Sequence, residues 1–204
     1  MLPSTRGVLI SFEGTERVGK STQINRLSQW LGSKGLDVLA LREPGGTALG
    51  EALRRIVLEG QEITSPWAEF LIFAAARAEL FSTIIGPALE EGKVVLVDRF
   101  IDSSVAYQAY GRQVPVSQVE AVNHWVTGQR DPDMTFLLVG AGWQERGGDI
   151  VEDRDQGFFY RVAQGYNDLA KRWPHRIYPI DAHQSVDQIE QLIQVKVATI
   201  LGIA

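Results

Sequence analysis

Short runs of apolar residues alternate along this chain with longer segments in which apolar residues recur every three or four positions. The runs predict five strands, at residues 7–12, 37–41, 94–97, 134–139 and 176–180. The longer segments predict helices between the strands and one after the last strand. Strands that alternate with helices are typical of a parallel sheet covered by helices on both faces. The pattern therefore predicts a three-layer α/β fold around a five-stranded parallel sheet.

Polar residues mark where several of these helices start. Ser65-Pro66 fits an N-cap followed by a first helical position. Ser117 with Glu120, and Ser185 with Gln188, have the spacing of capping boxes. We expect these residues to shape the fold and assign them no function.

Length, charge and composition narrow the class of protein. The chain has 204 residues and a formal net charge of -5, which fits one domain and argues against a protein that coats nucleic acid through a broad basic face. It has no cysteine, which excludes disulfides, thiolate zinc sites and cysteine nucleophiles. Residues 1–7 are too short and polar for a secretion signal, and no apolar run approaches membrane-spanning length. We therefore expect a cytoplasmic protein without nucleic-acid or membrane partners.

The segment from Gly14 to Ser21 matches the pattern G-x-x-x-x-G-K-[ST] of a phosphate-binding loop. A predicted strand precedes it and a predicted helix follows it, which is the context that the motif requires. Backbone N–H groups of such a loop bind nucleotide phosphates, while Lys20 reaches the β and γ phosphates and Ser21 binds magnesium. A glycine-rich turn with a surface lysine is the weaker alternative. The motif predicts a P-loop NTPase fold that binds ATP through Gly14, Thr15, Glu16, Arg17, Val18, Gly19, Lys20, Ser21 and Thr22.

Charged residues also follow two of the predicted strands. Asp98-Arg99 comes directly after the strand at 94–97, and the turn Arg42-Glu43-Pro44-Gly45-Gly46-Thr47 follows the strand at 37–41. Ligands of open parallel sheets bind beyond the carboxyl ends of the strands. There Asp98 can hold Mg²⁺ through water while Arg99 faces phosphate. A salt bridge at a strand end and a plain strand–helix connection remain the alternatives.

Three segments that follow the loop in the sequence resemble segments of a known family. They are the turn at 42–47, Phe-Ala-Ala-Ala-Arg at 73–77 and Asp-Arg-Phe-Ile-Asp-Ser-Ser-Val-Ala-Tyr-Gln at 98–108. In this order they resemble the thymidylate kinases, from about Val8 to the helix containing Tyr166. The resemblance implies transfer of the γ-phosphoryl group of ATP to dTMP, giving dTDP and ADP, with Mg²⁺. It also implies a homodimer and a lid over the nucleotide, at about residues 141–156.

The resemblance suggests which residues hold the thymidine part of dTMP. Phe73 and Arg77 are four residues apart and so share a helix face, which lets the ring stack on thymine while the guanidinium donates to a base carbonyl. Ser104 resembles the residue that binds the base edge, and Gln108 lines the same site. Tyr107 resembles the residue that crowds the position of a ribose 2′-hydroxyl. Core packing of Phe73 and a hydroxyl-bearing helix surface are the alternatives.

Phosphoryl transfer needs positive charge around the reacting phosphates. Arg54 resembles the arginine that binds the acceptor phosphate, and we count Lys20 and Arg99 as the other cations. Glu16 resembles the acid near the sugar 3′-hydroxyl and the metal. Arg42 and Pro44, from the turn, complete the expected dTMP site, whereas Glu43 receives no firm role.

Two features depart from the family pattern. Many bacterial members have a catalytic arginine in the lid, but here the lid segment is several residues shorter and has Asp149-Ile150 where many show Asp-Arg. Another group, which includes eukaryotic members, has the arginine in the phosphate loop, where Arg17 stands here. Our hypothesis is that Arg17 supplies the transition-state cation. Val139 stands where the family commonly has Asp, which indicates a rebuilt segment or a weaker grip on the nucleotide.

Two other functions stay open. Val139 and the short lid favour a nucleotide-binding regulator that retains the fold without efficient transfer, but the intact set of Lys20, Ser21, Asp98 and Arg99 argues against it. A kinase for another nucleoside monophosphate, or for a deoxynucleoside, is the third possibility. The helix predicted near residues 67–81 is apolar on more than one face, which a dimer interface would explain.

Overall fold

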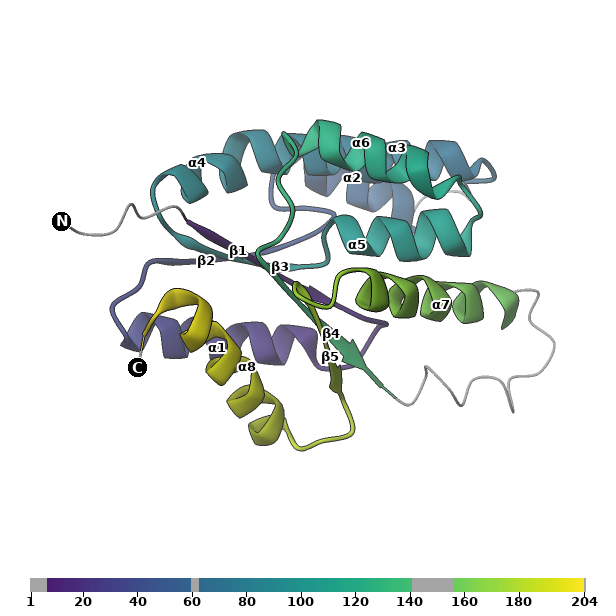
Figure 1. Ribbon diagram of the computed structural model, residues 1–204. Coiled ribbons are helices and arrows are strands. Elements are labelled where there is room, and N and C mark those ends of the chain that lie inside the picture. The colour runs from purple at the N-terminus through teal and green to yellow at the C-terminus, as the bar shows by residue number, and fades with distance from the viewer. Residues whose placement is uncertain (1–6, 60–62, 141–155, 204) are drawn as a thin grey trace.

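The computed structural model describes residues 7–59, 63–140 and 156–203, and in it a central sheet lies between two layers of helices (Figure 1). The five strands are parallel and lie in the order β2-β3-β1-β4-β5. Each predicted strand is confirmed to within one residue at either end. The strands are β1 (Val8–Glu13), β2 (Val38–Arg42), β3 (Val94–Asp98), β4 (Met134–Val139) and β5 (Ile177–Asp181).

Two helices cover one face of the sheet and the others cover the opposite face (Figure 1). The first layer consists of α1 (Lys20–Ser33) and α8 (Val186–Leu201). The second contains α2 (Ala48–Glu59), α3 (Pro66–Leu80), π-helical η1 (Phe81–Ile85), α4 (Gly86–Glu90), α5 (Ile101–Ser104), π-helical η2 (Val105–Gly111), α6 (Val116–Val126) and α7 (Gln156–Arg172). The predicted three-layer architecture is therefore confirmed. Among the described helices, none is long and apolar enough to cross a membrane.

Two of the three predicted helix starts are confirmed. The Ser65 hydroxyl caps α3 by accepting the Ala68 N–H, and Ser185 forms a capping box with Gln188 at α8. The capping box predicted at Ser117 is wrong. The carbonyl of Pro115 accepts the first bonds of α6, so the helix begins at Val116 and Ser117 lies inside its first turn.

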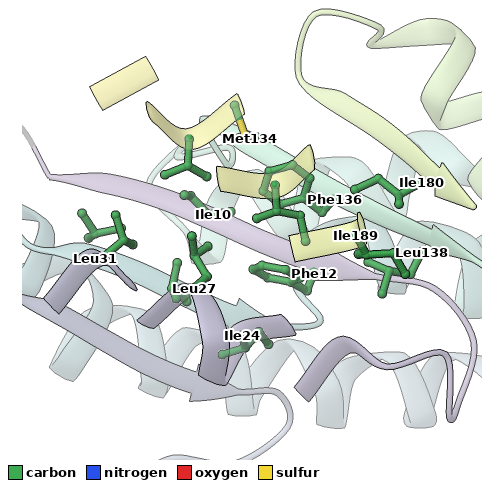
Figure 2. Close-up of a cluster of buried hydrophobic side chains, with 14 residues drawn as sticks. Ile10, Phe12, Ile24, Leu27, Leu31, Met134, Phe136, Leu138, Ile180 and Ile189 are labelled. Atoms are coloured by element: carbon green, nitrogen blue, oxygen red, sulfur yellow. The ribbon is translucent and has the colours of Figure 1, made fainter. Parts of the chain in front are cut away.

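The sheet face toward α1 and α8 carries an apolar core (Figure 2). Because strand residues alternate between the faces, Ile10 and Phe12 of β1 point into this core, together with Phe136 of β4. The Phe12 and Phe136 ring centroids are 5.4 Å apart. On this face the sheet and the two helices are thus held together by apolar packing.

The opposite face combines two apolar clusters with a buried polar layer. The hydroxyls of Ser11 and Thr135 are 2.8 Å apart, and Thr135 also donates to Asp102 of α5. Arg176 binds both carboxylate oxygens of Asp102, at 2.6 and 2.9 Å. The layer continues along β1 to Glu13, whose side chain is fully buried. It therefore leads from the middle of the sheet to the carboxyl ends of the strands.

Candidate active site

The phosphate loop connects the carboxyl end of β1 to the start of α1. Gly14 has a φ of 127°, and a Cβ atom there would overlap the carbonyl oxygen of Leu138 at the end of β4. Gly19, just before the helix, has a φ of 95°. Both values lie in the region that favours glycine. The two glycines of the motif are thus required by backbone geometry, and the loop packs directly against β4.

Lys20 lies inside this loop with only 7% of its surface exposed. Its ammonium donates to the carbonyl oxygen of Thr15 at 2.7 Å and lies 3.9 Å from the Asp98 carboxylate. Burial, followed by the positive charge of Arg99, lowers the pKa of Lys20 to about 8. The side chain therefore stays a cation at neutral pH, as the predicted contact with phosphate requires.

Ser21 and Asp98 bring two oxygen ligands together next to Lys20. The Ser21 hydroxyl donates to the Asp98 carboxylate at 3.1 Å. Mg²⁺ prefers such hard oxygen ligands, and it is usually bound by one or two protein groups together with substrate phosphates. In the described ranges, no group of three or more His, Cys, Asp or Glu side chains could hold a metal. The Ser21–Asp98 pair therefore fits a metal that also takes ligands from nucleotide phosphates.

Arg17 stands at the exposed side of the loop, with a φ of 61°. A left-handed conformation is uncommon for a residue other than glycine and is worth attention where it occurs near a site. Across the described ranges, its guanidinium makes no hydrogen bond or ion pair. Exposed Glu16 beside it is likewise without such a contact to any described residue. Both side chains are thus available to bind a nucleotide.

The turn after β2 is tied to α2 by charged side chains. Arg42 pairs with Glu51 at 3.1 Å, and Glu51 also accepts the Gly46 N–H at 2.9 Å. The Gly46 N–H, followed by Arg42, lowers the pKa of the Glu51 carboxyl. Arg54 donates to the carbonyl oxygen of Pro44 at 2.9 Å. The structure thus brings Arg42, Pro44 and Arg54 together, with Arg42 engaged by Glu51.

Arg77 is more deeply buried than the sequence suggested. Only 2% of its surface is exposed, and its guanidinium makes four hydrogen bonds. It donates to the Glu43 carboxylate at 2.8 Å, the Ser104 hydroxyl at 2.9 Å, the Asn123 amide oxygen at 2.6 Å and the Phe100 carbonyl at 3.1 Å. Arginine has five N–H groups, so one N–H remains without a bond inside the described chain. Arg77 and Ser104 are therefore directly joined.

Phe73, one turn before Arg77 on α3, belongs to none of the three apolar clusters. The ring is half-buried. The core-packing alternative for Phe73 therefore loses support. By contrast, Gln108 is buried and donates to Glu69 at 3.0 Å, so a contact with the base would have to come from its remaining polar atoms.

Arg99 and Tyr107 pack against each other near the end of β3. The guanidinium lies over the Tyr107 ring, 5.0 Å from its centroid, and donates to the Ser103 hydroxyl at 3.4 Å. Arg99 has a φ of 70°, and its N–H is bound by the Phe12 carbonyl at 2.9 Å. The left-handed backbone turns the chain between β3 and α5, next to the phosphate loop.

Of two buried carboxylates at this site, sequence analysis missed Glu13 and gave Glu43 no firm role. Glu43 pairs with Arg77, and burial raises the pKa of its carboxyl. Glu13 accepts hydrogen bonds from the Phe100 N–H, the Ser103 hydroxyl and the Tyr166 hydroxyl. Burial, followed by the charge of Asp102, raises the pKa of Glu13 to about 7. For Glu13 the available signal was a charged residue that ends an apolar strand.

The expectations about the lid fall outside the described residues. They concern residues 141–155, including Asp149, and only Gln156 at the end of the expected lid is described, as the first residue of α7. Val139, the other departure from the family pattern, is half-buried at the end of β4 and packs against an apolar cluster on the α7 side. Its carbonyl accepts the Ala182 N–H at 2.8 Å. Val139 therefore has an apolar packing role here.

Comparison with known proteins agrees with this geometry. The family model described as thymidylate kinase matches residues 12–193. A thymidylate kinase of Halothermothrix orenii is 45% identical over 202 residues, covering 94% of this chain and 97% of the relative. One from an Exiguobacterium species is 43% identical over 193 residues, covering 90% and 91%.

A solved structure extends the similarity to three dimensions. The crystal structure of thymidylate kinase from Ehrlichia chaffeensis matches with a TM-score of 0.78 and 34% sequence identity, covering 97% of this chain and 99% of that one. Sequence and fold are thus similar over nearly the whole length. The chain belongs to the thymidylate kinase family, as its phosphate loop and the segments behind it predicted.

Proposed function

We propose how this chain performs the reaction of its family, in which ATP phosphorylates dTMP to dTDP. ATP binds to the loop from Gly14 to Thr22, with Lys20 at the β and γ phosphates. The observation that carries this proposal is the buried ammonium of Lys20, which lies beside Asp98 at the carboxyl edge of the sheet. An ordered loop with a dehydrated cation is suited to binding a polyphosphate.

Magnesium binding is the second part of the proposal. The Ser21 hydroxyl and the Asp98 carboxylate would hold Mg²⁺, Asp98 through water, and their 3.1 Å separation supports this assignment. When bound with ATP, Mg²⁺ neutralises charge on the phosphate oxygens. Lys20 and Arg99 add fixed positive charge on the protein side.

dTMP occupies the neighbouring half of the site in this proposal. Phe73 stacks on thymine, while Arg77, Ser104 and Gln108 face the base edge. Tyr107 limits the sugar to deoxyribose. Arg54, Arg99 and Arg42 bind or flank the acceptor phosphate, next to Pro44, and Glu16 faces the sugar and the metal. The half-buried Phe73, outside the apolar clusters, supports this assignment.

Arg17 is proposed as the cation that stabilises the transition state. The reaction spreads negative charge over the transferred phosphoryl group, and a guanidinium can bind two of its oxygens at once. Arg17 suits this role because its side chain is exposed on the phosphate loop and makes no hydrogen bond or ion pair with the described residues. It would act in place of an arginine from the lid.

The test compares Arg17→Ala with Arg55→Ala, a matched change at an exposed arginine of α2. We expect Arg17→Ala to lower kcat by roughly 10³-fold or more, with ATP still bound, and Arg55→Ala to leave kcat unchanged. Turnover is followed as ADP release. Arg146 and Arg154 are the arginines of the expected lid segment. If Arg17→Ala keeps nearly normal turnover while Arg146→Ala or Arg154→Ala abolishes it, the cation comes from the lid and the proposal is wrong.

Selectivity is tested with the same assay and different acceptors. We expect dTMP to be preferred over dGMP and dCMP because Phe73 and Arg77 suit a thymine base. We expect it to be preferred over thymidine because Arg54 and Arg99 bind the acceptor phosphate. The rate with dUMP measures what the thymine methyl group contributes. A preference for another monophosphate would reassign the acceptor pocket. Binding of ATP without turnover of any acceptor would support the regulator that Val139 first suggested.

The remaining assignments concern organisation. We propose one cytoplasmic kinase domain of 204 residues with its lid at about residues 141–156, acting as a homodimer. Exposed apolar side chains on α3, Trp67 at 38% and Leu71 at 51%, support the dimer. Sedimentation at the mass of one 22.6 kDa chain would contradict it.

A further inference from the structure

Glu13 is a carboxylate in a position that stability alone does not favour. It ends β1 on the face opposite Phe12, and no part of its side chain is exposed. Burying an ionisable group costs free energy unless hydrogen bonds and charges compensate for it. Strongly perturbed buried acids are therefore found preferentially at functional sites.

Three hydrogen-bond donors converge on Glu13 from two distant segments. One carboxylate oxygen accepts the Phe100 N–H at 2.8 Å, and the other accepts the hydroxyls of Ser103 and Tyr166. Phe100 and Ser103 belong to the segment after β3, whereas Tyr166 lies in α7. One side chain thus connects the end of β1 to both the Arg99 turn and α7.

The Arg99 turn needs such support because its backbone is strained. A φ of 70° at a residue other than glycine is energetically costly and persists only where surrounding contacts fix it. The Phe12 carbonyl binds the N–H of Arg99, and Glu13 binds the next N–H, that of Phe100. Two successive amides of the turn are thus held by two successive residues of β1.

The same contacts reach the Arg99 side chain. Ser103 donates its hydroxyl to Glu13 and accepts an N–H from the Arg99 guanidinium at 3.4 Å. Tyr166 lies within hydrogen-bond distance of Ser103 at 2.9 Å and packs edge-on against Tyr107, over which Arg99 lies. A continuous set of contacts therefore runs from Glu13 through Ser103 to the guanidinium.

We propose that Glu13 is a positioning residue for phosphoryl transfer, because it holds the Arg99 turn and α7 in the arrangement that presents the Arg99 guanidinium to the phosphates. The inference rests on the role proposed above for Arg99. Glu13 does not touch the nucleotides in this proposal. Its effect on the reaction passes through Arg99.

The first test is Glu13→Gln in the full-length chain, because the amide keeps the shape of the side chain and removes its charge. A cation displaced by about 1 Å costs on the order of 10²-fold in rate, so we expect kcat to fall by about 10- to 100-fold. We expect KM for ATP and dTMP to change by less than about threefold, since the main binding contacts stay. Wild-type kcat in Glu13→Gln would overturn the proposal.

Asp133→Asn is the matched control. Asp133 accepts the Leu9 N–H at 2.8 Å, so it binds a backbone amide of the same strand, but at the end away from the site. Neutralising it removes the carboxylate charge and its ion pair with Arg130, without touching the Arg99 turn. We expect wild-type kcat in Asp133→Asn, and an equal fall of kcat in both variants would overturn the positioning role.

A double-mutant cycle with Arg99→Ala separates positioning from a general structural effect. If Glu13 acts through Arg99, Glu13→Gln lowers kcat in the wild type but changes it by less than about twofold in the Arg99→Ala background. An equal loss in both backgrounds overturns the proposal for Glu13 and leaves the role of Arg99 intact. Wild-type kcat in Arg99→Ala overturns the role of Arg99 itself, and this inference with it.

Ser103→Ala tests the link between Glu13 and Arg99 if Glu13→Gln does not fold. It removes the hydroxyl that links Glu13 to the Arg99 guanidinium and leaves the buried charge in place. We expect kcat to fall by about tenfold, as is common when a group supporting a site residue is removed. An unchanged kcat in folded Ser103→Ala would overturn the link.

Discussion

The two faces of the sheet are built on different principles. Toward α1 and α8 the strands contribute apolar side chains, such as Phe12 and Phe136, up to Asp98 at the end of β3, which binds Ser21 of α1 (Figure 2). Toward α5 and α7 the same strands contribute Ser11, Glu13 and Thr135, all buried and hydrogen-bonded. Neighbouring residues of β1 thus have different roles. Ile10 and Phe12 pack in the apolar core, whereas Ser11 and Glu13 belong to the polar layer that reaches the site.

This division follows from the alternation of side chains along a strand. A polar layer contributes less to stability than apolar packing of the same volume, because each buried polar group loses its water. In return, hydrogen bonds are directional and fix atoms in defined positions. The face toward α1 and α8, called the dry face, therefore contributes mainly to stability, whereas the opposite face adds a polar layer that fixes the geometry of the residues around Arg99.

The largest effect on stability is expected from Phe136→Ala on the dry face. Phe136 is fully buried, and removing such a ring leaves a cavity that costs about 3–5 kcal/mol of the free energy of unfolding. We expect kcat of the folded protein to stay within about twofold of wild type, since a cavity on this face leaves the polar contacts in place. Urea denaturation followed by circular dichroism measures the first quantity, and ADP release measures the second.

Leu192→Ala is the control for Phe136→Ala. Leu192 lies on α8 with 46% of its surface exposed, so its truncation should cost much less than the loss of a buried ring. If Phe136→Ala lowered kcat of the folded protein as strongly as Glu13→Gln, the two faces would not be functionally distinct.

A somewhat smaller effect is expected from Asp102→Asn in the polar layer. Arg176 is 8% exposed and binds both carboxylate oxygens of Asp102. Removing one partner leaves a buried charge uncompensated, which costs about 3 kcal/mol of the free energy of unfolding. Urea denaturation measures this loss.

The double variant Asp102→Asn/Arg176→Met checks the physical reason. Because the uncompensated charge is gone, we expect the double variant to recover most of the stability lost in Asp102→Asn. Equal instability of the single and double variants would mean that the pair contributes through packing or hydrogen bonds to Thr135, and not through its charges.

The smallest of these effects is a pH dependence from Glu13. Its pKa is raised from 4.5 to about 7 in the folded protein, so between these values the folded state binds more protons than the unfolded chain. Stability from this group is present below pH 4.5 and is lost as the pH rises through 7. At 1.36 kcal/mol per pKa unit, the full loss is about 3 kcal/mol, of which about three quarters falls between pH 5 and pH 8. Denaturation at pH 5, 6, 7 and 8 measures it.

Glu13→Gln should flatten this part of the curve, because glutamine does not titrate. Glu43, whose pKa is also raised by burial, keeps its own contribution of the same sign. Glu51 and Asp181 have lowered pKa values, so they act at lower pH. The charged and titratable groups that face Glu13 are Arg99, Asp102, Lys20, Arg176, Tyr107 and Tyr166. Identical curves for wild type and Glu13→Gln would contradict the assignment.

Much of the fold was predictable from sequence because its signals are local. Apolar runs indicated the five strands, and the spacing of Gly14, Gly19 and Lys20 identified the phosphate loop. The one wrong capping box, at Ser117, failed because Pro115 starts the helix earlier. A capping motif spans only four residues, so a residue just before it can take the N-cap position and start the helix earlier.

The interior of the site was not predictable, because its contacts join distant parts of the chain. Glu13 and Tyr166 are 153 residues apart in sequence, and Arg77 binds Asn123 across 46 residues. No local pattern encodes such pairs. The resemblance to the family named Arg77 and Ser104 as site residues, but it gave no reason to expect that one donates to the other.

Lys20 also bears on the energetics of nucleotide binding. Its ammonium is already removed from water and donates to a carbonyl of its own loop. An arriving phosphate would exchange that carbonyl for a better acceptor and would not have to strip a hydrated cation. The free-energy cost of removing this charge from water is therefore part of folding and not of nucleotide binding. The affinity for nucleotide is correspondingly greater than it would be with a hydrated lysine.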